Sequence, residues 1–123
     1  MKWIALIAGG ILGTLARYVL SGVISNSFGT SFPYGTLTVN LIGCFLIGFF
    51  AALSGNKSWL NPEAALFLMT GFCGAFTTFS TFMLETSDLI KVGESFRAFL
   101  NIALSVILGF FVFRIGVLLA GKV

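Results

Sequence analysis

The sequence predicts an all-α membrane protein with four transmembrane helices, and three observations support this prediction. Of the 123 residues, 58% are hydrophobic and only 9% are charged, so the chain has too little polar surface for a water-soluble fold. Apolar stretches of about 20 residues, the length needed to cross a bilayer, recur along the chain. No polar stretch is long enough for a second domain, so we expect residues 1–123 to form a single transmembrane domain.

Short polar segments separate the predicted spans. We place the spans at 3–24, 36–53, 61–90 and 95–120. The first has no clear cleavage site, so we expect it to be retained as a helix and not removed as a signal peptide. The third has a typical start signal, because Asn61 can cap the helix, Pro62 takes its first position and Glu63 lies in its first turn.

The third span is too long and too rich in hydroxyl groups for an ordinary straight helix. About 30 residues would extend about 45 Å as an α-helix, whereas the hydrocarbon core is about 30 Å thick. The middle of the span, residues 70–82, contains glycine and β-branched threonine, which both weaken helices. We therefore expect the third helix to be broken at mid-membrane, near Gly74 to Thr78, where the backbone lines a cavity or is buried in protein. The alternative is an unbroken helix in which the threonines bond to their own backbone.

Basic residues are spread almost evenly over the two expected sides of the membrane. The flanking ones are Lys2, Lys57 and Lys122 on one side, and Lys91 and Arg97 on the other. Arg17 and Arg114 lie inside spans, from which we expect Arg17 to reach the first loop and Arg114 the C-terminal side. Because orientation needs a marked asymmetry, this balance permits insertion both ways and hence an antiparallel, dual-topology homodimer. A single orientation fixed by Lys2 and Lys57 is equally compatible with the charges.

Glycines recur at positions where helices could approach closely. They are Gly9 and Gly13 in the first span, Gly43 and Gly48 in the second, and Gly109 and Gly116 in the fourth. Such spacing serves contacts between two copies or, more commonly, within one.

Several polar and aromatic side chains at membrane depth suit an ion pathway. Asn40 can donate two hydrogen bonds to an anion, or bond to another helix. Phe79 and Phe82 are three residues apart on one helix face, so the positive edges of their rings can face an anion, although packing is the alternative. Asn101 and Ser105 share one face of the fourth span and could extend a polar track.

The charged and reactive residues exclude several other functions. Arg17 could draw anions to a pore mouth, and Glu85 and Asp88 could pair with it or lie near an interface. No carboxylate lies near the centre of a span, where a proton-coupled exporter needs one. The chain has no histidine, and no nucleophile–base pair or phosphate loop is evident, so we do not expect an enzyme. The scattered charges also argue against a nucleic-acid partner, and we expect Cys44 and Cys73 to be small buried residues.

Two motifs resemble those of the Fluc (CrcB) family of fluoride channels. They are residues 35–40, Gly-Thr-Leu-Thr-Val-Asn, and residues 74–82, Gly-Ala-Phe-Thr-Thr-Phe-Ser-Thr-Phe. The resemblance extends over essentially the whole chain. It implies a passive fluoride-selective channel that exports cytoplasmic fluoride across the cell membrane of a prokaryote, built as an antiparallel homodimer with two pores.

The resemblance also implies roles for residues of the pathway. Asn40 matches the family's pore-lining asparagine, and Phe79 and Phe82 match two phenylalanines that both protomers contribute to the fluoride track. Ser80 and Thr81 fall among the family's hydroxyl contacts. Ser105 occupies a polar position of the fourth span, although Gly109 one turn later departs from the pattern.

The resemblance further implies a structural sodium ion at the dimer centre. Backbone carbonyls at the helix break would hold it, and the matching positions are Gly74 and Thr77. Here Ala75 replaces a glycine that is common in the motif, which need not affect a carbonyl ligand. Arg17 matches an arginine of the first helix and Glu85 a glutamate of the third. A small dual-topology multidrug exporter and a membrane scaffold subunit are the alternative functions.

Overall fold

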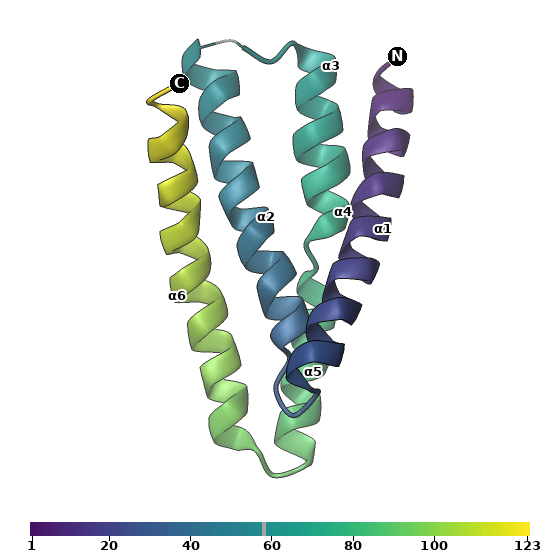
Figure 1. Cartoon of the computed structure of the whole chain (residues 1–123), viewed down its shortest axis with the longest axis vertical. Helices are drawn as coiled ribbons and strands as arrows, with labels where there is room; N and C mark the ends of the chain where they lie inside the picture. The colour runs from purple at the N-terminus through teal and green to yellow at the C-terminus, as the bar shows by residue number, and fades with distance from the viewer. Residues whose placement is uncertain (58) are drawn as a thin grey trace.

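The computed structural model describes residues 1–57 and 59–123, except for the side chains of residues 56 and 57, so the Lys57 side chain of the charge balance lies outside the described part. In that part, four helical segments are long and apolar enough to cross a membrane. They are Lys2–Phe28, Tyr34–Gly55, Pro62–Lys91 and Ser95–Ala120. Both termini lie at the same end of the molecule (Figure 1), as an even number of passes requires. The chain is therefore an all-helical multi-pass membrane protein.

The first two spans are helices joined by a tight turn. The first, α1 (Lys2–Phe28), continues past the predicted end at residue 24, because the polar residues 25–27 remain helical and Gly29, with a φ of 87°, ends it. The second consists of α2 (Tyr34–Ala52) and a π-helical stretch η1 (Leu53–Lys57). The third span begins as predicted, because the Asn61 side chain accepts a hydrogen bond of 2.7 Å from the Ala64 N–H.

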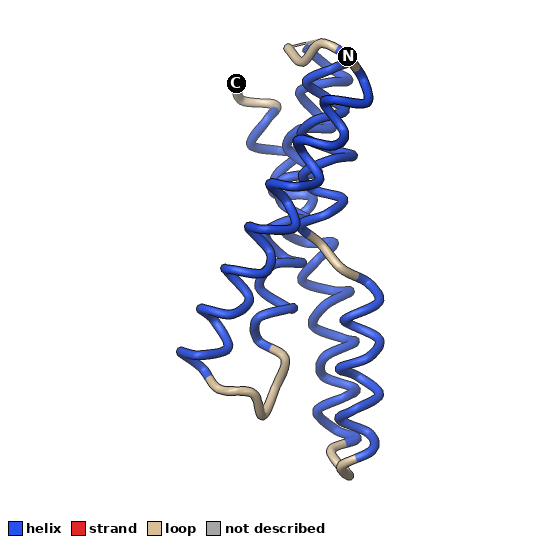
Figure 2. The backbone as a smooth tube through the Cα atoms, turned by 90° about the vertical axis from the view of Figure 1, so that its right-hand side faces the viewer, coloured by secondary structure: helices blue, strands red, loops and turns tan. Residues whose placement is uncertain are grey.

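The third span consists of several pieces of different backbone geometry. They are α3 (Pro62–Ala65), the π-helical stretch η2 (Leu66–Cys73), α4 (Gly74–Phe76) and α5 (Phe79–Lys91). Between α4 and α5, Thr77 (φ −88°, ψ 159°) and Thr78 (φ −149°, ψ 119°) have extended backbone. Figure 2 shows this segment as a short loop between helical stretches. The last span is α6 (Ser95–Ala120), which begins after a turn that contains Gly93 with a φ of 84°.

Close packing within the chain depends on glycines of the predicted pattern. α1 packs along η2, and α2 packs along α6. A methyl group added at Gly9 or Gly13 would collide with the backbone of η2, and one added at Gly116 would collide with the backbone of α2. These glycines therefore serve contacts within one chain.

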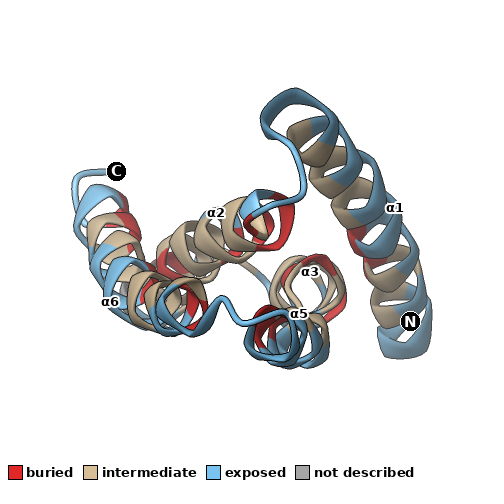
Figure 3. Cartoon of the chain, turned by 90° about the horizontal axis from the view of Figure 1, so that it is seen from below, coloured by how far each residue is buried: buried red, intermediate tan, exposed pale blue. Residues whose placement is uncertain are grey.

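The outer faces of the helices remain apolar and exposed. Buried residues gather where α2, α6 and the third span face one another, and the outward faces of α1 and α6 are exposed (Figure 3). Examples of exposed large apolar residues are Ile7, Val19, Phe99, Phe110 and Leu118. In a membrane protein, such side chains contact lipid or another copy of the chain.

A cavity at the helix break

A cavity of about 480 Å³ opens beside the extended segment at Thr77 and Thr78. Its walls come from α2, the third span and α6. The cavity brings together six of the predicted site residues, namely Asn40, Gly74, Thr77, Phe79, Phe82 and Ser105. Both cysteines also line it, and both are free thiols. The lining is mainly apolar with a few polar groups, which is typical of ligand sites in proteins.

The Asn40 side chain pairs with the backbone of the break. Its Nδ2 donates to the Thr78 carbonyl oxygen at 3.1 Å, and the Thr78 N–H donates to its Oδ1 at 2.8 Å. Asn40 thus makes a hydrogen bond to another segment of the chain, which was one of the two alternatives that its sequence position allowed. A primary amide carries two hydrogens on its nitrogen, so Asn40 keeps a second N–H for another acceptor.

The extended backbone at Thr77 and Thr78 goes with two N–H groups that bond to side chains and not to helical carbonyls. The helical donor to the Gly74 carbonyl is the Thr78 N–H, which donates to Asn40 instead. The helical donor to the Thr77 carbonyl is the Thr81 N–H, which donates to Oγ1 of Thr78 at 3.2 Å. The two residues that were predicted to bind a cation are therefore deprived of their usual helical partners.

Arg17 bonds to the same region of the third span. Its Nε donates to the Ala75 carbonyl oxygen at 3.0 Å, and the side chain is half-buried. The expectation that Arg17 reaches out to the first loop is therefore wrong, because the Ala75 carbonyl of α4 accepts a hydrogen bond from its side chain. Asp88, which could have paired with Arg17, instead lies 3.9 Å from Lys91, one turn along α5.

The two phenylalanines stand at the cavity in different environments. Their ring centroids are 5.8 Å apart and the ring planes meet at 63°, so the edge of one ring faces the other. Phe82 is only 6% exposed, whereas Phe79 is 72% exposed. Phe79 therefore lies at an open side of the cavity and Phe82 in its wall.

The three predicted hydroxyl groups lie in different environments. The Ser105 Oγ is buried and has no hydrogen-bond partner within the described part of the chain. Thr81 accepts a hydrogen bond of 3.0 Å from the Thr78 hydroxyl and belongs to the cap of α5. Ser80 is exposed, and neither Ser80 nor Thr81 is among the described residues that line the cavity.

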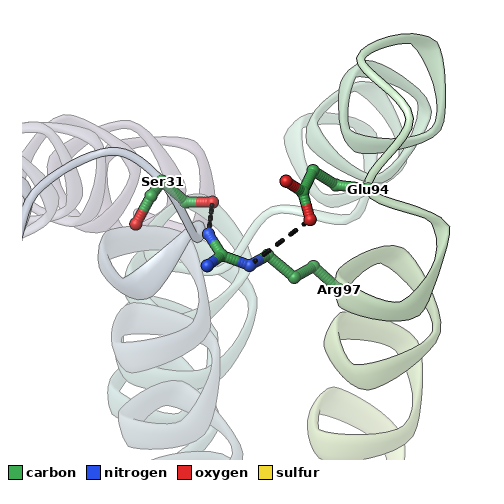
Figure 4. Close-up of polar contacts among 3 residues, drawn as sticks. All are labelled: Ser31, Glu94 and Arg97. Carbon is green, nitrogen blue, oxygen red and sulfur yellow. Dashed lines mark hydrogen bonds and ion pairs between the residues drawn. The ribbon is translucent and has the colours of Figure 1, made fainter.

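Glu85 belongs to a second cavity, also of about 480 Å³, near the ends of α1 and α5. One carboxylate oxygen is buried without a hydrogen bond in the described part of the chain, and the Thr36 hydroxyl lies beside the carboxyl group. Arg97 also lines this cavity, and its side chain lies between Ser31 and Glu94 (Figure 4). Its Nη1 donates to the Ser31 carbonyl at 3.0 Å, and its Nε lies 3.6 Å from the Glu94 carboxylate, so it connects the first loop to α6.

Sequence reasoning missed the central position of Thr78. This residue caps α5 and receives the Asn40 side chain. The signal was available, because a threonine that precedes the first turn of a helix is a common cap. The role of Asn101 was left open by the sequence; in the structure it bonds to Thr86 at 2.9 Å and is not among the described residues that line the cavity.

The fold and the cavity define a class of protein. It is a multi-pass helical membrane protein in which residues with amide, hydroxyl and aromatic side chains line one cavity. Broken helices that offer free backbone groups are typical of ion-binding sites in membrane transport proteins.

Comparison with known proteins identifies the family. Residues 4–117 match the family described as CrcB-like protein, Camphor Resistance (CrcB). The chain is 49% identical over 109 residues to the fluoride-specific ion channel FluC of Maridesulfovibrio salexigens, which covers 89% of this chain and 86% of that protein. It is 48% identical over 121 residues to the FluC protein of Chlorobaculum tepidum, covering 98% and 95%, and 47% identical over 113 residues to that of Chlorobium phaeobacteroides, covering 92% and 88%. The chain therefore belongs to the CrcB family.

Proposed function

We propose that this protein is a passive, fluoride-specific channel in the cell membrane of a prokaryote, through which cytoplasmic fluoride leaves down its gradient. The observation that carries the proposal is the cavity at the helix break, which brings the Asn40 amide, the Ser105 hydroxyl and two phenylalanine rings together. The similar proteins are named as fluoride-specific ion channels, which agrees with the expectation of a protein that is not an enzyme.

The chemistry of the cavity suits a small, strongly hydrated anion. A channel must replace the water around the ion and yet release the ion quickly. Asn40 and Ser105 can donate hydrogen bonds, and the rings of Phe79 and Phe82 can present positive edges. No lysine or arginine is among the described residues that line the cavity, so no fixed positive charge there would trap the anion.

An antiparallel homodimer would complete the pathway. Phe79 is 72% exposed although it lines the cavity, so one chain leaves a side of the cavity open. A second copy in the opposite orientation would cover this side and would contribute its own rings, giving two pores. The near balance of basic residues between the two ends supports insertion both ways.

The carbonyls at the break support a structural sodium ion at the dimer centre. Gly74 and Thr77 both line the cavity, and the N–H groups that would bond to their carbonyls in a helix are diverted. Carbonyl oxygens of unwound helices are suitable ligands for sodium. When bound, the ion would supply a positive charge shared between two chains. Gly74 and Thr77 would hold it through their carbonyl oxygens.

Fluoride efflux from liposomes that contain the purified protein tests this function. A channel empties fluoride-loaded liposomes without a proton gradient. Export of organic cations that requires a proton gradient would instead favour a small multidrug exporter. The absence of any transport would favour a membrane scaffold.

A further inference from the structure

Two consecutive hydrogen bonds connect α6 to the wall of the cavity. Nδ2 of Asn101 donates to Oγ1 of Thr86 at 2.9 Å, and the Thr86 hydroxyl donates to the carbonyl oxygen of Phe82 at 2.7 Å. A hydroxyl has one proton, which here is given to Phe82, so Thr86 acts as the acceptor toward Asn101. The order of donors and acceptors is therefore fixed from α6 to α5.

This contact is a buried polar link between the two helices. Asn101 is 1% exposed, and Thr86 and Phe82 are each 6% exposed. A buried carboxamide costs free energy unless it is hydrogen-bonded. Sliding either helix by one residue would separate Asn101 from Thr86, so the contact favours one relative position of α5 and α6.

The Asn101–Thr86 contact lies one helical turn from two residues that line the cavity. In Figure 1, α5 and α6 are antiparallel helices joined by the turn at 92–94, and they move apart with distance from this turn. Phe82 precedes Thr86 by four residues and Ser105 follows Asn101 by four, so both steps lead one helical turn in the same direction. The contact therefore determines how the Ser105 hydroxyl and the Phe82 ring, which both line the cavity, stand relative to each other.

We propose that Asn101 and Thr86 are positioning residues of the anion pathway, which fix the Ser105 hydroxyl relative to the Phe82 ring and thereby set both the fluoride flux and the preference for fluoride over chloride. This inference rests on the proposed function. The Ser105 Oγ has no partner in the described part of the chain, so its hydrogen remains available to an ion. Neither Asn101 nor Thr86 needs to touch that ion.

The test compares fluoride and chloride efflux from liposomes for a set of variants. Thr86→Val and Asn101→Leu each remove one partner of the contact, and Thr86→Ser retains the hydroxyl. We expect the first two to lower the fluoride flux at least about threefold, which corresponds to the loss of one hydrogen bond between membrane helices. We also expect both to lower the fluoride-to-chloride ratio, which a general loss of folded protein would not change. Thr86→Ser should restore most of the flux and the ratio.

The double variant and a neighbouring control complete the design. Thr86→Val combined with Asn101→Leu should be no more impaired than the worse single variant, because both remove the same contact. Ser87→Ala, at an exposed position next to Thr86, should behave as the wild type. If Asn101→Leu does not fold, the comparison of Thr86→Val with Thr86→Ser decides.

Three results would overturn the inference. They are an unchanged ion ratio in Thr86→Val, additive effects in the double variant, and a Thr86→Ser variant as impaired as Thr86→Val. The wild type in the same assay distinguishes a failure of the proposed function from a failure of the positioning role. A wild type that carries no fluoride refutes the proposed function as well, whereas a conducting wild type with unaffected variants refutes only the positioning role.

Discussion

At the residue scale, Phe79 and Phe82 offer the most direct test of the pathway. Replacing either ring by isoleucine keeps an apolar side chain but removes the positive ring edge that can face an anion. We expect Phe79→Ile and Phe82→Ile each to reduce fluoride efflux by roughly tenfold, on the scale of a lost aromatic contact. Phe99→Ile, at an exposed position of α6 outside the cavity lining, is the matched control. Wild-type flux in both variants would remove the rings from the pathway.

The Asn40 amide can be tested with a variant that retains one of its two hydrogen bonds to Thr78. Asn40→Asp keeps an oxygen to accept the Thr78 N–H but replaces the donor with a negative charge. At an effective dielectric constant of about 20, two unit charges about 4 Å apart repel each other by about 4 kcal/mol, or roughly a thousandfold in occupancy. We expect the variant to fold and to lose fluoride efflux. A variant that conducts normally would show that the anion does not approach Asn40.

At the element scale, α2 passes close to the extended segment at Gly43. A methyl group there would collide with Cγ2 of Thr77, whereas one at Gly10 of α1 would meet no atom of the described chain within 4 Å. We expect Gly43→Ala to destabilise the protein by about 1–3 kcal/mol through overpacking and to move the Thr77 carbonyl. Gly10→Ala should be neutral or stabilising, since alanine favours helix. Thermal unfolding in detergent measures both, and equal stability would show that Thr77 is not constrained by α2.

Some features of the helices could be predicted from the sequence, and others could not. The four spans and the Asn61 cap follow from composition and local signals, because hydropathy and capping depend on neighbouring residues. The partners of Arg17 and Asn101 do not, because each bonds to another helix, 58 and 15 residues away along the chain. Ser105 lines the cavity, whereas Asn101, one turn before it, bonds to Thr86. Helical spacing alone could not separate the two, because it does not show which polar group already has a hydrogen-bond partner.

At the scale of the whole molecule, the proposed sodium ion should stabilise the dimer. Exchanging sodium for N-methylglucamine removes a cation that the Gly74 and Thr77 carbonyls would share between two copies. We expect a larger fraction of monomer in size-exclusion chromatography without sodium, and recovery of the dimer when sodium is restored. The Gly10→Ala protein, unchanged at the break, should respond as the wild type does. A dimer of equal stability in both buffers would contradict the carbonyl site.

Dual orientation is the last property of the whole molecule that can be tested. Both termini lie at one end, with Lys2 and Lys122, and the 92–94 turn lies at the other, near Lys91 and Arg97. Because basic residues are retained on the cytoplasmic side, this balance should distribute a C-terminal tag over both sides of the membrane. Lys2→Gln combined with Lys122→Gln should shift the population toward chains whose 92–94 turn is cytoplasmic. Antiparallel pairs would then be fewer, and fluoride efflux per chain should fall with the minority orientation. A wild-type tag found on one side only would exclude the antiparallel dimer, even if the fluoride flux itself were normal.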